Sequence, residues 1–74
     1  MNTGNNIAKR RKELGRKLYQ SRNDMGLSQV SVANQLGIKQ SLISKYENGD
    51  LLPNVFTLAE FARLYNKSIE QLIN

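Results

Sequence analysis

Glycines divide most of this 74-residue chain into short segments, and this division strongly constrains the fold. Gly26 and Gly37 bracket residues 27–36, and Gly49 follows soon after. Each segment between them carries apolar residues at helical spacing. A glycine at the end of such a run adopts left-handed backbone angles easily and ends the helix. Because no alternating pattern typical of strands is present, the sequence predicts an all-α fold built mostly from short helices.

The first predicted helix is the longest and runs from Asn6 to Met25, after a loosely held polar segment at residues 1–5. Gly15 costs about 1 kcal/mol of helix propensity, so we expect the helix to fray before it. Gly26 is expected to end the helix. The apolar residues expected along its inner face are Ile7, Leu14, Leu18 and Met25.

Four short helices are predicted to follow, over about residues 29–36, 40–47, 55–65 and 69–73. Ser28 and Ser68 stand where an N-cap hydroxyl accepts from a free amide. Asn48-Gly49-Asp50 is a turn sequence, and Pro53 is expected to close the loop. The residues expected to face the core are Val32, Ala33, Leu36, Ile38, Ile43, Tyr46, Leu58, Phe61, Ala62, Tyr65, Ile69 and Leu72.

The composition argues against catalysis and against metal or cofactor binding. The chain has no cysteine and no histidine, which removes the commonest nucleophile, general base and metal ligands. Its six carboxylates are spread along the chain without a paired site. No apolar run is long enough to span a bilayer, and no apolar signal sequence is visible. We therefore expect a cytoplasmic non-enzyme with no membrane partner and no small-molecule ligand.

The formal net charge of +5 is concentrated in the first third of the chain. Residues 26–74 have four basic and four acidic side chains and are neutral overall. Such asymmetry fits a polyanionic partner, or else a solvated helix face that aids solubility.

The segment from Gln29 to Glu47 has helix-turn-helix spacing, with two short helices joined by a turn containing Gly37. Ala33 is small where the two helices would cross. In such a motif the second helix enters the major groove of DNA. Its expected outward residues suit base readout, although an ordinary polar face is the alternative. They are Lys39, Gln40, Ser41, Leu42, Ser44 and Lys45.

Three short motifs together carry a resemblance to a known family. They are Gly-Leu-Ser-Gln at 26–29, Leu-Gly-Ile at 36–38 and Ile-Ser-Lys-Tyr-Glu-Asn-Gly at 43–49. The chain resembles the Cro/phage-repressor (XRE) helix-turn-helix family over about residues 14–73. This implies a five-helix lambda-repressor-like DNA-binding domain. The sequence departs from the family at Val30, Ser31 and Lys67, where acidic or apolar residues are usual.

The resemblance implies roles for particular residues. Arg22 and Glu47 match a partly buried salt bridge that is structural. The base-reading positions are Gln40, Ser41 and Lys45, with Ser44 and Leu42 more variable. Gln29 and Asn48 match contacts to the DNA backbone, and we add Lys39 and Ser28 as further candidates.

Residues 1–13 are expected to form a partly helical basic extension ahead of a domain at 14–74. The extension is either a basic arm on DNA, through Lys9, Arg10, Arg11 and Lys12, or a solvated continuation of the helix.

The main functional hypothesis is a transcriptional regulator, more specifically a repressor, that binds double-stranded DNA. A single module reads few base pairs, so a homodimer on an operator with dyad symmetry is expected. Leu72 and Ile73 belong either to the dimer surface or to the core. The alternative function is a protein-binding antitoxin or adaptor with the same fold.

Overall fold

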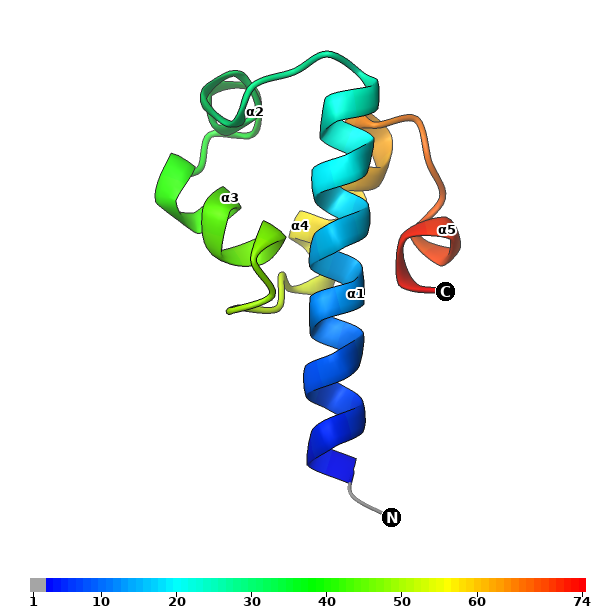
Figure 1. The fold of residues 1–74 in the computed structure, drawn as a ribbon. Coiled ribbons are helices and arrows are strands. Elements are labelled where there is room, and N and C mark those ends of the chain that lie inside the picture. Colours follow the sequence, from blue (N-terminus) through cyan, green and yellow to red (C-terminus); the bar gives the residue numbers. More distant parts are fainter. Residues whose placement is uncertain (1–2) are drawn as a thin grey trace.

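The computed structural model describes residues 3–74 and contains five helices in that range (Figure 1). The helices are α1 (Thr3–Asp24), α2 (Gln29–Leu36), α3 (Gln40–Glu47), α4 (Val55–Leu64) and α5 (Ile69–Ile73). The long α1 packs against α3 on one side and α5 on the other, while α2 packs on α3 and α4 on α5. The all-α fold predicted from the sequence is confirmed.

The first helix differs most from its prediction. It begins at Thr3, so residues 3–5 are helical, whereas residues 1–2 lie outside the described part of the chain. It also runs without a break through Gly15, where fraying was expected. A Cβ atom on Gly15 would lie 2.6 Å from the carbonyl oxygens of both Tyr46 and Glu47. Gly15 therefore lets the backbone at the end of α3 approach α1, and this packing offsets its low helix propensity.

Two of the short helices, α2 and α5, begin directly after the serines that were predicted to cap them. The Ser28 side chain accepts a hydrogen bond from the Ser31 amide, and Ser68 forms a capping box with Gln71. Gly37 ends α2 in the left-handed conformation, with a φ of 68°. Asn54, which the sequence analysis did not single out, caps α4 by accepting from the Thr57 amide. These local hydrogen bonds satisfy amides that a helix leaves free at its first turn.

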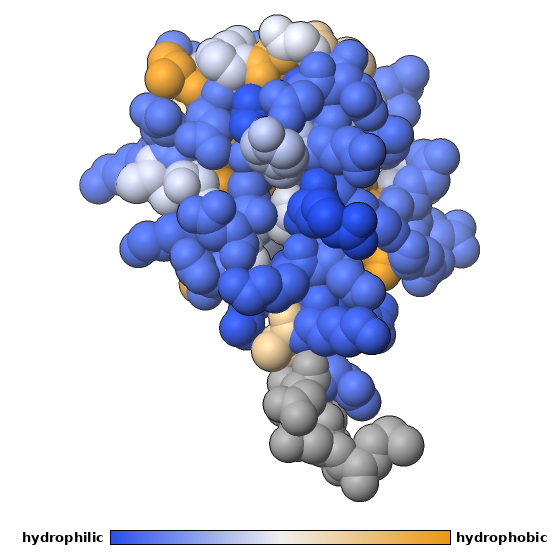
Figure 2. All heavy atoms as spheres, in the orientation of Figure 1, coloured by the Kyte–Doolittle hydropathy of each residue, from blue (hydrophilic) through white to orange (hydrophobic). Residues whose placement is uncertain are grey.

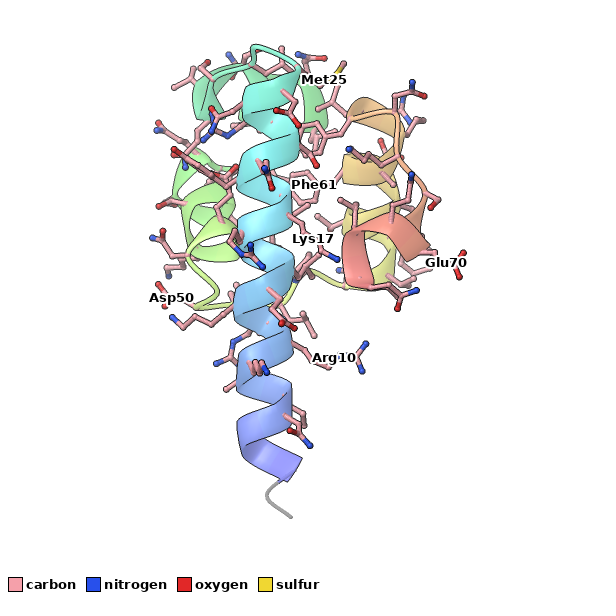
Figure 3. The ribbon with its side chains drawn as sticks, turned by 45° about the vertical axis from the view of Figure 1, so that its right-hand side comes forward. Arg10, Lys17, Met25, Asp50, Phe61 and Glu70 are labelled. Carbon is pink, nitrogen blue, oxygen red and sulfur yellow. The ribbon has the colours of Figure 1, made fainter. Side chains whose placement is uncertain are left out.

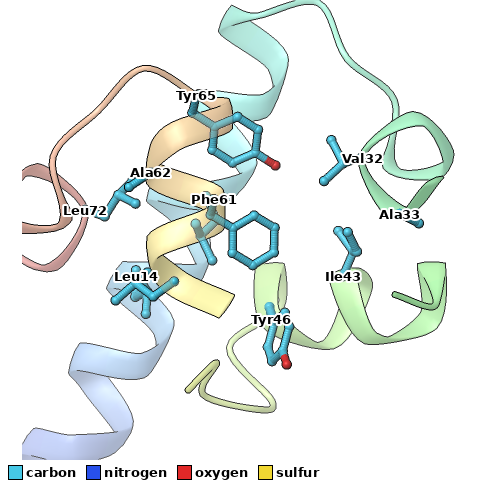
Figure 4. Close-up of a cluster of buried hydrophobic side chains, with 11 residues drawn as sticks. Leu14, Val32, Ala33, Ile43, Tyr46, Phe61, Ala62, Tyr65 and Leu72 are labelled. Atoms are coloured by element: carbon cyan, nitrogen blue, oxygen red, sulfur yellow. The ribbon is translucent and has the colours of Figure 1, made fainter. Parts of the chain in front are cut away.

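The core is centred on Phe61 (Figure 4). Its ring meets the Tyr46 ring edge-on at 5.9 Å and stacks on the Tyr65 ring at 5.8 Å. Burial raises the pKa of Tyr65 well above its usual range, and its hydroxyl has no hydrogen-bond partner within residues 3–74. The apolar residues buried in the core are Leu14, Leu18, Val32, Ala33, Ile43, Tyr46, Leu58, Phe61, Ala62, Tyr65 and Leu72.

Two residues predicted to face the core do not. Ile7 and Met25 have 54% and 48% of their surface exposed. Met25 follows the last residue of α1, so it has left the helical face that Leu14 and Leu18 occupy. Ile7 lies on the N-terminal part of α1, which extends beyond the packed helices in Figure 1. Leu36, Ile38 and Ile69 are partly buried against the core.

None of the helices described between residues 3 and 74 is long and apolar enough to cross a bilayer.

We predict that Gly15→Ala destabilises the protein although alanine is the better helix former. The added methyl group would force α1 and α3 apart, because its close neighbours are backbone atoms. Overpacking of this kind costs about 1–3 kcal/mol. Urea unfolding followed by circular dichroism measures the effect, with the exposed Gln20→Ala on the same helix as control. A variant as stable as the wild type would show that the helices can separate without cost.

Candidate nucleic-acid interface

The outward face of α3 presents a compact set of polar side chains. Ile43 and Tyr46 are buried, which directs the opposite side of the helix to solvent. Gln40, Ser41 and Lys45 are exposed there, Ser44 is half-buried beside them, and Leu42 is half-buried against the core. Gln40 and Ser44 lie one turn apart, as do Ser41 and Lys45. The predicted reading residues therefore share one side of a single short helix, except Leu42 at its margin.

A chain of hydrogen bonds connects this face to α1 and α2. Arg22 Nε donates to Glu47 Oε2 at 2.7 Å, and Arg22 Nη2 donates to Glu47 Oε1 at 3.0 Å. Gln29 Nε2 donates to the same Glu47 Oε1 at 3.0 Å. Gln40 Nε2 then donates to Gln29 Oε1 at 3.4 Å. Glu47, at the end of α3, thus orients Gln29 at the start of α2. Gln29 in turn orients Gln40 at the start of α3.

The Arg22–Glu47 ion pair lies inside the protein. The two side chains retain only 9% and 4% of their exposure. Arg22 also donates from Nη1 to the Leu27 carbonyl at 2.9 Å, which fixes the connection between α1 and α2. Hydrogen bonding to Glu47 raises the pKa of Arg22, so this guanidinium stays charged. A bidentate ion pair of this kind fixes the relative orientation of the guanidinium and the carboxylate as well as the distance between them.

The N-terminal part of α1 contacts the turn that follows α3. Arg11 Nε donates to the Gly49 carbonyl at 2.7 Å, and Lys12 Nζ donates to the Asn48 carbonyl at 3.2 Å. Lys9 and Arg10 are exposed on the same helix. All four residues of the predicted basic arm are therefore helical and continuous with the domain. Whether they contact DNA stays a prediction.

Comparison with known families identifies this arrangement. A helix-turn-helix family model matches residues 18–72, which include all of α2 through α4 and most of α5. The chain belongs to the Cro/phage-repressor family of helix-turn-helix proteins. This confirms the resemblance found in the motifs of residues 26–49.

Two curated relatives and two solved structures agree with this assignment. The HTH-type transcriptional activator BcrR of Enterococcus faecalis is 32% identical over 62 residues, which are 84% of this chain and 30% of the activator. The ImmF control region 10 kDa protein of Bacillus phage phi105 is 34% identical over 61 residues, which are 82% of this chain and 68% of that protein. The chain thus spans less than a third of the first relative's length.

Two structures of the BldD DNA-binding domain, one from S. venezulae, are each 32% identical to this chain. Their TM-scores are 0.78 and 0.79, over 89% and 90% of this chain and 99% and 97% of theirs. Residues 18–72 therefore form a helix-turn-helix DNA-binding domain of the kind that transcriptional regulators carry.

The remaining candidate contacts of this helix-turn-helix domain lie at the ends of α2 and α3. Ser28 is exposed, but its oxygen already accepts from the Ser31 amide. Lys39 is the exposed residue before α3 and makes no capping bond with its side chain. Asn48 follows α3, and its Nδ2 donates to Ser44 Oγ at 3.5 Å. Their roles at DNA stay predictions.

The sequence analysis missed two features of this domain. It treated Arg11 and Lys12 as parts of an arm, and their contacts with the turn at 48–49 became visible only in the fold. It also left out Tyr19, whose ring lies 5.4 Å from the Arg22 guanidinium carbon. The spacing of Tyr19, three residues before Arg22 on a helix, was the signal that could have suggested this contact.

We predict that Arg22→Met costs about 3–5 kcal/mol of unfolding free energy, because it leaves the buried Glu47 carboxylate without its partner. The double variant Arg22→Met/Glu47→Leu should recover much of this loss, since no buried charge then remains. Chemical unfolding measures both. Arg63→Ala, which breaks the exposed Arg63–Glu60 pair, is the control and should change stability little. A small effect of Arg22→Met would mean that water reaches Glu47.

Proposed function

We propose that this protein is a transcriptional regulator that reads operator DNA by placing α3 in the major groove. The observation that carries the proposal is the exposed polar face of α3, whose leading Gln40 is hydrogen-bonded through Gln29 to the buried Glu47. A reading side chain that is already oriented loses little conformational freedom on binding. The BldD DNA-binding domains, which have the same fold, support DNA as the partner.

The side chains of this face match the chemistry of base edges. A glutamine amide can donate to and accept from one adenine, and an ammonium can reach the acceptors of guanine. We assign these roles to Gln40 and Lys45, with Ser41 and Ser44 as shorter partners. Gln29 reaches a phosphate at the start of α2, where helix amides add to the attraction. Leu42 is only half-exposed, and we propose for it a marginal contact with a thymine methyl.

Two copies are needed for a useful operator length, and an apolar surface offers a place for them to meet. It lies between the N-terminal part of α1, the start of α4 and α5. Of the two residues assigned from the sequence either to the dimer surface or to the core, Leu72 belongs to the core with 1% exposure, whereas Ile73 is 42% exposed. The exposed apolar residues of this surface, here called the apolar groove, are Ile7, Leu52, Val55 and Ile73.

Repression is the mode of regulation that we propose. It requires occupancy of the operator, which a reading face and a dimer surface supply. Activation requires a further contact with the transcription machinery. The protein-binding alternative, an antitoxin or adaptor, would dock its basic helix on an acidic partner and would not need Gln40 and Lys45 on the outer face of α3.

We predict that Gln40→Ala and Lys45→Ala each weaken operator binding by about 1–3 kcal/mol and relax the sequence preference. The operator is first obtained by selection from random duplexes, and binding is then measured by fluorescence anisotropy. Gln35→Ala, on the exposed side of α2, is the control. If both variants keep the wild-type affinity and preference, α3 does not read the bases. If the wild type shows no salt-dependent binding to any duplex, the adaptor function is favoured instead.

We predict that Val55→Glu disrupts self-association by placing a charge in the apolar groove. Val55 is 61% exposed, so the monomer should keep its fold. Sedimentation equilibrium measures the effect, with Val30→Glu on α2 as the matched control at a similar exposure of 51%. If the Val55 variant still forms the dimer, or if the wild type is monomeric with and without operator DNA, the apolar groove is not a dimer interface.

A further inference from the structure

The exposed surface of α1 is divided into two stripes of different charge. Side chains three and four residues apart lie on one helical face. One such face carries three cations and no carboxylate, and all five of its residues are exposed. This face, here called the cationic stripe, consists of Lys9, Lys12, Arg16, Tyr19 and Asn23.

The neighbouring exposed face of α1, about a quarter-turn around the helix, carries both of its acidic residues within the described range. Glu13, Lys17, Gln20 and Asp24 follow the same spacing there. This side faces α5, because Lys17, Gln20 and Asp24 line a shallow cleft with Lys67 and Gln71. In Figure 3, Lys17 extends from α1 towards α5. The acidic residues of α1 therefore lie beside the cationic stripe, with Glu13 next to Lys9 and Arg16, and the stripe itself carries only cations.

The cationic stripe adjoins the end of α3. Lys12 Nζ lies 3.2 Å from the Asn48 carbonyl oxygen, directly after α3. The Tyr19 ring lies beside the Arg22 guanidinium, and Asn23 Oδ1 accepts from Arg22 Nη1 at 3.5 Å. Arg22 in turn holds Glu47 at the last position of α3. Figure 1 shows α1 and α3 side by side, and Figure 2 shows a largely hydrophilic surface across them.

We propose that the cationic stripe binds the phosphate backbone of the operator beside the segment that α3 reads. This inference rests on the proposed function and extends its contact surface along α1. Lys9 and Arg16 are seven residues apart, or about 10 Å along the helix. With α1 lying along the duplex axis, that distance equals about three axial steps of about 3.4 Å, which separate four successive phosphates of one strand.

The proposal separates the basic residues near the N-terminus by role. Lys9, Lys12 and Arg16 are phosphate contacts of a rigid helix. Arg11 is a structural residue, because its Nε donates to the Gly49 carbonyl and its side chain is half-buried. Arg10 lines the apolar groove and lies outside the stripe.

The test compares two double variants that lose the same charge. Lys12→Gln/Arg16→Gln removes two cations of the stripe, and Lys17→Gln/Lys67→Gln removes two from the cleft beside α5. Affinity for the selected operator is measured by fluorescence anisotropy between 50 and 200 mM salt, on the order of the range in which phosphate contacts dominate. Thermal unfolding of each variant establishes that it is folded at the temperature of the assay.

Removing one cation from a phosphate makes the slope of log affinity against log salt shallower by about 0.9, so the slope of the stripe variant should fall by about 1.8. The cleft variant should keep a slope close to that of the wild type. The stripe variant should also keep its preference among operator sequences, because phosphates carry no sequence.

Equal slopes in the two variants would overturn the proposal while leaving the proposed function intact, because the effect would then come from net charge alone. A stripe variant with the wild-type slope would overturn it as well. A wild type that binds no duplex at any salt concentration would overturn the proposed function, and this inference with it.

Discussion

The ion pair between Arg22 and Glu47 connects the three helices that position the proposed reading face. It joins the last turn of α1 to the last residue of α3, and Glu47 also accepts a hydrogen bond from Gln29 at the first position of α2. Because the pair is buried, its direction is fixed by packing as well as by charge. Three helices are thereby held in one relative orientation, and Gln40 takes its position from the same carboxylate through Gln29.

The short helices were predictable because the signals that define them are local. Ser28 and Ser68 cap helices through amides three residues away, and Gly37 ends α2 with its own backbone angles. The first helix was less predictable because its limits depend on distant contacts. The low helix propensity of Gly15 predicts fraying of the helix before it. The backbone of residues 46–47, distant in sequence, packs so closely against Gly15 that a side chain there would not fit.

The candidate site divides in the same way. Helical periodicity was sufficient to find the outward face of α3, since Ile43 and Tyr46 had to point inward. The hydrogen bonds from Gln29 to Glu47 and from Gln40 to Gln29 bridge residues 18 and 11 positions apart, so no spacing rule could supply them. The prediction that Ile7 faces the core was wrong. Periodicity shows that Ile7 shares a helical face with Leu14 and Leu18, but it does not show where the neighbouring helices end.

The close approach at Gly15 has a consequence for how this domain can change. The carbonyl oxygens of residues 46–47 pack against the backbone of α1 at Gly15. The contact between α3 and α1 therefore involves main-chain atoms as well as side chains. Exposed residues on the outer side of α3, such as Ser41 and Lys45, take no part in this contact with α1. Under the proposed function, a lineage can therefore exchange these residues and acquire new target sites without altering the contact between α1 and α3.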